Sequence, residues 1–210
     1  MSTEQPMKHK NIFYRFLSVI LLIISFNVAA EPVASITVVV GVAKLKDAAT
    51  KNMRALKVGD TIQVNDEVIT EANAKVKVVL LDKTVLDLGE NSVLVVDRFV
   101  LGDSATKGAV GASFKKGLFR YVSGQIAKSN GGVELKVPDA VITVRGTEFE
   151  AFIDDSGIPG QTPKTSVLLD SGAITLRSGN IVQEINQPGF VADVQGLGKI
   201  SKPVENRRCL

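Results

Sequence analysis

Few residues of this chain have the types and spacing that chemistry requires. Ser113 and Lys116 have the Ser-x-x-Lys spacing of the acylating pair of penicillin-binding enzymes. That pair needs the start of a helix and companion Ser-Asp-Asn and Lys-Thr-Gly motifs, whereas here it precedes the strand-like GLFRYV and the companions are absent from the sequence. We therefore interpret Lys115, Lys116 and Arg120 as a solvated strand face. No catalytic residue is predicted.

Acidic and glycine-rich segments are also interpreted as ordinary turns. Asp154 and Asp155 have the residue type for a carboxylate dyad or a Ca²⁺ site, but adjacent residues at a strand end point apart and no EF-hand spacing follows. The sequence Asp-Asp-Ser-Gly is typical of turns. The segment from Gly102 to Gly108 lacks the order and spacing of a phosphate-binding loop. We predict no metal site and no cofactor.

The first thirty residues have the pattern of an export signal. Lys8, Lys10 and Arg15 precede the apolar segment Phe16 to Phe26, and small residues follow up to Ala30. As a helix, this eleven-residue segment spans only about 16 Å of a hydrocarbon core that is roughly 30 Å thick. We predict a helical signal peptide over residues 1–30, cleaved after Ala30; if it is not cleaved, it is the chain's sole membrane attachment.

Export changes the chemistry that remains. His9 is the single histidine of the chain and leaves with the leader, which excludes Ser-His-Asp and Cys-His catalysis and any histidine-ligated metal in the mature chain. Cys209, the one cysteine, lies in the polar segment near the end and has no partner within the chain for a disulfide. We predict that the mature protein is not an enzyme.

The charge balance argues against nucleic acid as a partner. The whole chain has 25 basic and 22 acidic residues, and removing three basic and one acidic residue with the leader leaves a net charge of +1. Binding to nucleic acid depends on a surplus of Lys and Arg that displaces counterions. We therefore expect no nucleic-acid partner.

Short apolar segments alternate with turn residues from Ser35 onward, which is typical of a sheet protein. Segments 118–128 and 167–177 both have an apolar run, Ser-Gly, a small residue and Ile, and such strand-glycine-strand units favour stacked strands. The predicted fold class is all-β, a rolled or solenoid-like sheet over residues 31–196, with a two-sheet β-sandwich as the alternative. Residues 197–210 are predicted to be a polar tail, and residues 48–56 are the remaining helical candidate.

The run AVITVRGTEFEAFI, residues 140–153, has a charge and a glycine inside a strand pattern. Ile142 and Val144 are its apolar positions before the arginine, and Phe149, Ala151 and Ile153 are those after it. Residues i and i+2 share a face of a strand, so the buried parity changes between 144 and 149. A regular strand cannot change parity. We therefore predict a bulge or bend over residues 145–147.

Four residues of this run form the candidate site: Arg145, Gly146, Thr147 and Phe149. Gly146 is the residue best able to adopt the dihedral angles of a bulge. The five donors of Arg145 could satisfy carbonyl and carboxylate groups where the backbone ladder is interrupted, or the side chain could project toward a partner. The sequence favours the structural role and leaves the partner-binding role open.

The motif VRGTEF, at residues 144–149, resembles that of the FecR domain family. ALKVGDTIQVNDEVIT, AKVKVVLLDKTVLDLGENSVLVV and TSVLLDSGAITL support the resemblance, which covers roughly Val39 to Leu176. The chain departs from the family pattern at Asp82-Lys83-Thr84, where Asp-Gly-Ser is frequent, and at Val137-Pro138, where Thr-Pro is frequent. FecR-type regulators carry a cytoplasmic anti-sigma region, and only fifteen residues precede the hydrophobic segment here.

The resemblance implies an extracytoplasmic fold but not direct control of a sigma factor. We expect a periplasmic or secreted, non-catalytic binding or sensory module that engages an envelope protein or glycan in signalling, with strand addition to an open sheet edge as one mode. The alternative is a structural or scaffolding component of the cell envelope.

Overall fold

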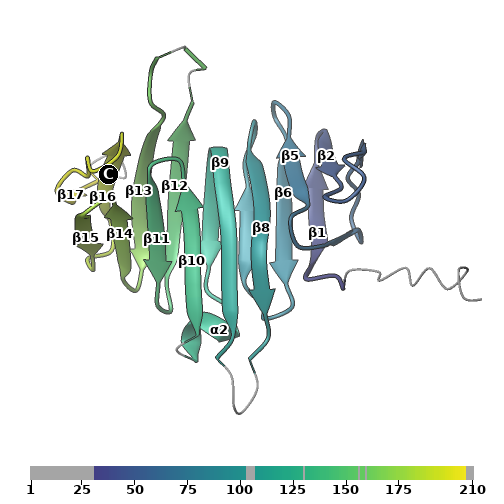
Figure 1. Ribbon diagram of the computed structural model, residues 1–210, viewed down its shortest axis with the longest axis horizontal. Coiled ribbons are helices and arrows are strands. Elements are labelled where there is room, and N and C mark those ends of the chain that lie inside the picture. Colours follow the sequence, from purple (N-terminus) through teal and green to yellow (C-terminus); the bar gives the residue numbers. More distant parts are fainter. Residues whose placement is uncertain (1–30, 103–106, 130, 156, 159, 207–210) are drawn as a thin grey trace, which may run out of the picture. The chain divides into compact units, whose positions relative to one another are not determined.

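The computed structural model describes residues 31–102, 107–129, 131–155, 157–158 and 160–206 (Figure 1). Their regular secondary structure is almost entirely strand, so the all-β prediction is confirmed. The strands are β1 (Ala34–Val40), β2 (Ala43–Lys46), β3 (Met53–Ala55), β4 (Thr61–Ile62), β5 (Glu67–Thr70), β6 (Lys75–Leu80), β7 (Val85–Leu88), β8 (Val93–Val100), β9 (Ala109–Val122), β10 (Gly132–Val137), β11 (Ala140–Val144), β12 (Glu148–Asp154), β13 (Lys164–Ser171), β14 (Ile174–Ser178), β15 (Ile181–Ile185), β16 (Phe190–Gln195) and β17 (Val204–Glu205). The helix α2 (Gln125–Lys128) is a single turn.

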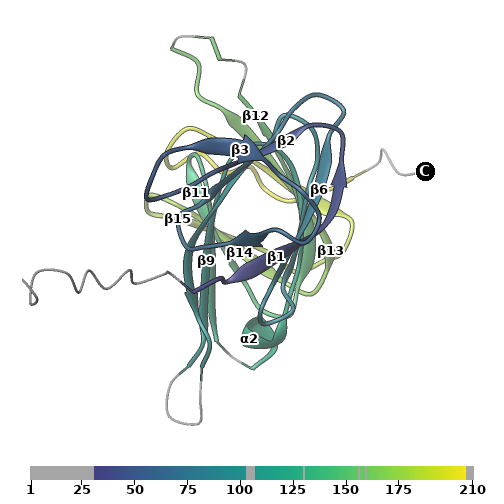
Figure 2. The ribbon, with the colours of Figure 1, turned by 90° about the vertical axis from the view of Figure 1, so that its right-hand side faces the viewer.

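The strands belong to two sheets that face each other (Figure 2). Sheet A has the order β4-β1-β6-β7-β9-β12-β13-β16-β17, and sheet B has the order β3-β2-β5-β8-β9-β10-β11-β14-β15. The neighbours pair in antiparallel fashion, apart from β9 and β10, which are parallel. Strands that precede β9 in the chain therefore lie on one side of it in both sheets, and strands that follow β9 lie on the other.

Strand β9 joins the sheets because it changes face along its length. Its residues 110, 112 and 114 are buried in sheet B, and residues 117, 119 and 121 are buried in sheet A. The register with β8 shifts beside Lys115, and Gly117 follows with φ of +95°. A bulge and a left-handed glycine thus absorb the extra residue that a change of parity requires.

The inward side chains of both sheets form a single hydrophobic core. Most are Val, Leu, Ile and Ala, the branched and small residues that fit a pleated surface. The aromatic contribution is small: the rings of Phe114 and Phe119 lie 4.3 Å apart between centroids, and those of Tyr121 and Phe149 lie 5.4 Å apart. The core therefore lies between the sheets along the whole row of strands.

Two local predictions differ from the structure. Residues 125–128 form α2 where a strand was expected, because the backbone N–H of Gln125 donates to the Asp82 carbonyl (2.7 Å) and that of Ile126 donates to the Asp82 carboxylate (3.3 Å). Residues 48–56, the helical candidate, instead form a turn and β3.

The chain from 197 to 206 does not leave the sheet. Val204 and Glu205 pair with β16, and the Asn206 N–H donates to the Gly189 carbonyl (2.8 Å). Pairing therefore extends beyond residue 196, where the polar tail was predicted to begin. The predicted signal peptide and Cys209 lie outside the described residues.

Candidate functional site

The VRGTEF motif lies where the chain passes from sheet B to sheet A. Strand β11 ends at Val144, β12 begins at Glu148, and the register of β12 shifts between Glu148 and Phe149. Gly146 has φ of +62°, in the left-handed region that favours glycine. The predicted bend over residues 145–147 is therefore confirmed, and it is a corner between two sheets.

Thr147 fastens this corner with four hydrogen bonds. Its hydroxyl donates to the Ala173 carbonyl (2.7 Å) and accepts the N–H of Arg145 (3.2 Å). Its own N–H donates to Ser123 Oγ (2.8 Å), and its carbonyl accepts the N–H of Ser123 (3.0 Å). Thr147 is 2 % exposed, so these bonds satisfy its own polar groups, which water cannot reach.

The four predicted site residues separate into two pairs. Thr147 and Phe149 point inward, and the Phe149 ring stacks on Tyr121. Burial raises the pKa of the Tyr121 phenol to about 12. Arg145 and Gly146 are exposed. The motif thus combines a buried structural lock with a solvent-facing turn, and the partner-binding role of Arg145 stays a prediction.

A second corner has the same chemistry without the motif. Thr70 Oγ1 donates to the Gly89 carbonyl (2.6 Å) and accepts the N–H of Ser92 (2.8 Å). Ser92 Oγ in turn donates to the carbonyl of Leu118 (3.2 Å) and accepts its N–H (3.1 Å). These bonds join the end of β5, the turn before β8 and the middle of β9. A buried threonine and serine therefore lock both corners.

The other chemical candidates occupy structural positions. The Ser113 hydroxyl lies in β9 and donates to the Asp97 carboxylate (2.5 Å), and Lys116 lies farther along the same strand, so the pair has no helix start. Asp155 accepts the N–H of Gly157 (3.1 Å), as expected of a turn. Residues 103–106 of the glycine-bounded segment lie outside the described residues.

The outer face of sheet A carries a furrow that crosses the strands. It consists of two adjoining cavities of about 260 and 540 Å³, which share Leu118 and Glu150. Its apolar floor includes Val40 on β1, Leu118 on β9 and Phe152 on β12, which are 51, 44 and 51 % exposed. Leu118 and Phe152 are direct cross-strand partners. An exposed aromatic ring beside aliphatic side chains is typical of interaction surfaces.

Paired charges border the apolar floor. Lys77, Asp87, Arg120 and Glu150 are successive cross-strand neighbours on β6, β7, β9 and β12. Lys77 lies 3.2 Å from Asp87. Alternating charges of this kind leave little net field, so the furrow suits a partner that offers apolar surface and hydrogen bonds.

The far end of the second cavity repeats this pairing. Lys164 lies 2.8 Å from Asp193, whose carboxylate also accepts the Ser166 hydroxyl at 2.6 Å. Asp193 is therefore held in place by a cation and a hydroxyl at the cavity that it lines.

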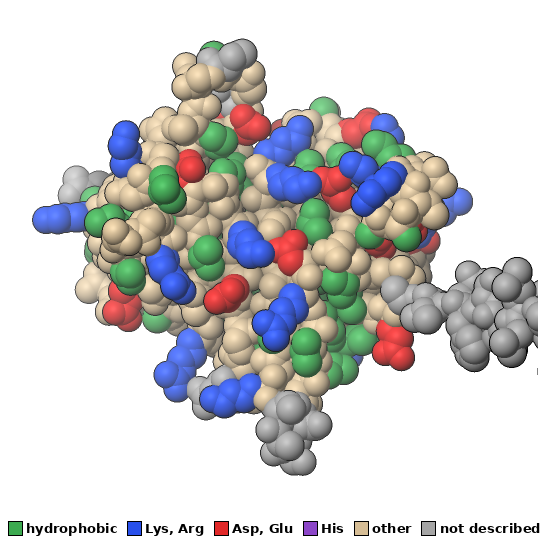
Figure 3. Space-filling view, viewed as in Figure 1, with side chains coloured by type: hydrophobic (Ala, Val, Ile, Leu, Met, Phe, Trp, Pro, Cys, Tyr) green, Lys and Arg blue, Asp and Glu red, His purple; other side chains and the backbone are tan. Residues whose placement is uncertain are grey.

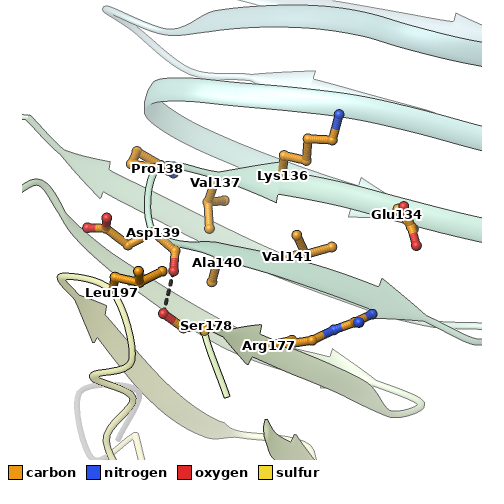
Figure 4. A pocket seen from close by; sticks show the side chains of 11 residues that line it. Glu134, Lys136, Val137, Pro138, Asp139, Ala140, Val141, Arg177, Ser178 and Leu197 are labelled. Atoms are coloured by element: carbon orange, nitrogen blue, oxygen red, sulfur yellow. Dashed lines mark hydrogen bonds between the residues drawn. The ribbon is translucent and has the colours of Figure 1, made fainter. Parts of the chain in front are cut away.

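On the outer face of sheet B, Figure 3 shows Lys and Arg side chains interspersed with acidic ones. This face carries a cavity of about 490 Å³ at the turn between β10 and β11 (Figure 4). There the Ser178 hydroxyl donates to the Asp139 carbonyl (2.5 Å), and the Gly196 N–H donates to the Asp139 carboxylate (3.0 Å). These bonds fasten the turn and occupy the polar groups at that end of the cavity.

Acidic groups near these surfaces have shifted pKa values with clear causes. Burial would raise the pKa of Glu67, but hydrogen bonds to Lys115 (2.6 Å) and Lys46 (3.3 Å) outweigh it and lower the pKa. Burial and the Glu148 carboxylate raise the pKa of Asp170. Both shifts follow from burial and from neighbouring charged groups on the sheets.

The sequence prediction missed the furrow, although a signal for it was present. In TEFEAFID the odd-numbered apolar residues Phe149, Ala151 and Ile153 point inward, so the same parity places Phe152 on the outer face. An aromatic residue at a solvent-facing strand position is the exception that could have indicated a binding surface. The neighbouring Leu118 could be recognised only with the strand register known.

Comparison with known proteins agrees with the motif and the fold. The model of the FecR protein family matches residues 66–175, more than half of the chain, and the chain therefore belongs to the FecR family. The match begins just before β5 and ends within β14. No curated protein matches the chain.

Two solved structures share the fold. Both are crystal structures, at 2.50 and 1.65 Å, of a protein from Parabacteroides distasonis ATCC 8503 described as a candidate anti-sigma factor. They are 14 and 15 % identical to this chain, each with a TM-score of 0.51 over 68 % of it. The chain covers 61 % of the length of those proteins. At this identity the likeness shows the fold alone.

Within residues 31–206, leaving out the few that are not described, none of the helical structure is long and apolar enough to span a bilayer.

Proposed function

We propose that this FecR-family protein is a non-catalytic, extracytoplasmic binding module that engages a protein or glycan of the cell envelope through the furrow of sheet A. The observation that carries the proposal is the exposed row of Val40, Leu118 and Phe152 between paired charges. Membership of a family of signalling proteins supports a sensory purpose for this binding.

A binding role suits the groups that the furrow offers. Phe152 presents a ring on which a sugar or an aliphatic side chain can pack, and Ser166 and Asp193 lie on the two strands beyond it. The serine hydroxyl is already bonded to the aspartate, which fixes the acceptor oxygens in place. Fixed polar groups beside an apolar floor select a partner by shape and hydrogen bonding.

The proposed location of the protein depends on its N-terminal leader, residues 1–30. Its basic residues, short apolar segment and small residues before Ala30 support export and cleavage, which would leave the module in the periplasm or outside the cell. Intact mass measurement of the protein purified from the envelope fraction tests this, since a mature chain that begins at Glu31 is expected. A full-length mass would instead mean that the leader stays and anchors the module.

Capture from envelope extracts tests the furrow. The wild-type domain and Phe152→Asp serve as baits, and Met53→Asp on β3 is the matched control because Met53 is 56 % exposed and lies outside the furrow. We expect wild type and M53D to retain the same protein or glycan and F152D to lose it. Equal capture by all three, or no specific capture by wild type, would contradict the proposal.

We also infer that a rolled sheet describes this architecture better than a two-sheet sandwich. The support is that β9 runs through both sheets and that the chain passes repeatedly from one to the other at glycine-containing corners. The alternative function, a structural component of the envelope, predicts open-ended self-association, which sedimentation analysis would reveal as species that keep growing with concentration.

A further inference from the structure

Strand β15 is an edge strand unlike the other three. The outer strands of the two sheets are β3, β4, β15 and β17. Strands β4 and β17 have 2 residues each and β3 has 3, whereas β15 has 5. Short edges are one of the ways in which proteins avoid unwanted pairing, because they offer few backbone groups to another strand. Of the four, β15 alone is long enough to accept a strand.

The backbone groups that β15 presents can be assigned from its hairpin. A two-residue turn, Gly179-Asn180, joins it to β14, and Ser178 pairs with Ile181 across that turn. The closing pair of such a turn is hydrogen-bonded, and bonding alternates along an antiparallel ladder. Residues 181, 183 and 185 therefore bond to β14, and the N–H and C=O groups of Val182 and Glu184 point away from the sheet.

These outward groups are nearly unused in the described part of the chain. The side-chain amide of Gln183 donates to the Glu184 carbonyl (2.9 Å). No other hydrogen bond involves the outward groups of Val182 and Glu184 there. Val182 is also 62 % exposed, as is Val58, and among the large apolar residues of those ranges only Leu197 is more exposed.

The sequence of β15, Ile-Val-Gln-Glu-Ile, is self-complementary about its middle residue. If a second copy of the strand lies antiparallel with Gln183 on the twofold axis, Val182 of one copy stands opposite Glu184 of the other. All the outward N–H and C=O groups are then paired in both copies. Ile181 of each copy meets Ile185 of the other on the inner face, where apolar cross-strand pairs are favourable.

We propose that β15 pairs with β15 of a second copy, extending sheet B through a twofold axis at Gln183. Glu184 of the second copy then shares a cross-strand row with Arg177, with Val182 between them. The Gln183 amide covers the edge in the monomer and releases the Glu184 carbonyl on pairing. An isologous contact of this kind closes on itself, so it produces a dimer and no filament.

The dimer is independent of the furrow. The furrow lies on the outer face of sheet A and β15 lies at the edge of sheet B, so both furrows of the dimer stay open. The proposed edge also lies beyond residues 66–175, the part of the chain that the family model matches. Failure of one proposal therefore leaves the other standing.

A cysteine on the axis tests the register. The experiment uses a chain in which Cys209→Ser removes the natural thiol. In this chain, Q183C places one thiol from each copy in a non-hydrogen-bonded pair, whose Cα atoms lie about 4.5 Å apart, within disulfide range. The matched control is V182C, because position 182 stands opposite position 184. Under mild oxidation we expect Q183C to form a disulfide-linked dimer much faster than V182C. Equal rates would exclude the proposed register.

Sedimentation of the otherwise unaltered mature chain tests the dimer itself. We expect a monomer–dimer equilibrium that Val182→Pro weakens about tenfold or more, because proline removes an outward N–H while sparing the ladder to β14. If V182P does not fold, Val182→Glu tests the same contact by placing a carboxylate beside Glu184 of the second copy. A monomer at every concentration, larger assemblies, or undiminished dimers of a folded variant would overturn the proposal.

Discussion

The two locked corners use the same polar chemistry with opposite exposure. At the first corner, Thr70 and Ser92 hold the middle of β9; at the second, Thr147 and Ser123 hold the entry to β12. The difference lies in the glycines. A Cβ atom on Gly117, at the first corner, would lie 2.6 Å from the Ser92 Cα, whereas a Cβ atom on Gly146 would meet nothing within 4 Å.

This difference separates the glycine that the fold requires, Gly117, from the exposed glycine of the family motif, Gly146. The first corner is closed, so its glycine is required by both dihedral angle and space. At the second corner, the backbone segments approach each other most closely at Gly172. A Cβ atom there would lie 2.5 Å from the Gly146 carbonyl oxygen. The exposed Arg145-Gly146 turn is therefore separate from the lock, and its role in binding a partner stays a prediction.

Substitution of the corner glycines is expected to have the largest effect on stability. Gly117→Ala should destabilise the protein by about 3 kcal/mol or more, because a left-handed dihedral angle and a backbone clash add together. Gly146→Ala should cost only about 1 kcal/mol, from the dihedral angle alone. Urea unfolding followed by circular dichroism measures both. Equal losses would mean that the two corners do not differ as described.

Alkaline pH should act on the second corner through Tyr121. The phenol ionises near pH 10 when unfolded and near about 12 in the native protein, so its stabilisation is complete below pH 10 and is lost as pH rises toward 12. The loss should approach about 1.4 kcal/mol per pH unit. Tyr121→Phe is the control and should lack this part of the alkaline dependence; parallel pH profiles for wild type and variant would contradict the assignment.

Removing each threonine hydroxyl compares the locks directly. Thr70→Val leaves the buried Ser92 N–H and the Gly89 carbonyl without a partner, and should cost about 2 kcal/mol. Thr147→Val removes the partner of the Arg145 N–H and of the Ala173 carbonyl. It should cost about 1 kcal/mol, because neither residue is buried and water can replace the hydroxyl. The measurement is the free energy of unfolding. The reverse order would show that the motif corner is the tighter one.

Arg145→Ala should have the smallest effect on stability, below about 0.5 kcal/mol, because the side chain is exposed. The same variant, used in the capture experiment, asks whether the arginine contacts the partner. A large loss of stability would instead give Arg145 the structural role that the sequence favoured.

The corner at residues 145–147 could be predicted because parity is a local property of the chain. Ile142, Val144 and Phe149 are enough to show that the strand changes face. The same count along β9, from Phe114 to Phe119, indicates the first corner, so both transitions were present in the sequence. The family motif drew attention to one of them only.

Contacts between distant residues account for what could not be predicted. Helix α2 depends on Asp82, more than forty residues earlier in the chain, whose carbonyl and carboxylate accept its first N–H groups. The furrow depends on strand order, which places Leu118 beside Phe152. Neither contact can be inferred from a short stretch of sequence. The outward position of Phe152 can, because it follows from the alternation of residues along one strand.

The shared strand β9 has a consequence for how the protein folds. Neither the eight strands before it nor the strands after it can complete their sheets without it. During synthesis, the strands before β9 cannot complete their sheets until β9 has been made. The strands after β9 then pair with both of its ends across long sequence separations, and such pairing slows folding. Mutations in β9 that leave the native contacts similar should therefore slow folding more than they speed unfolding. Because β9 belongs to both sheets, we expect the rate-limiting folding nucleus to be centred on this one strand.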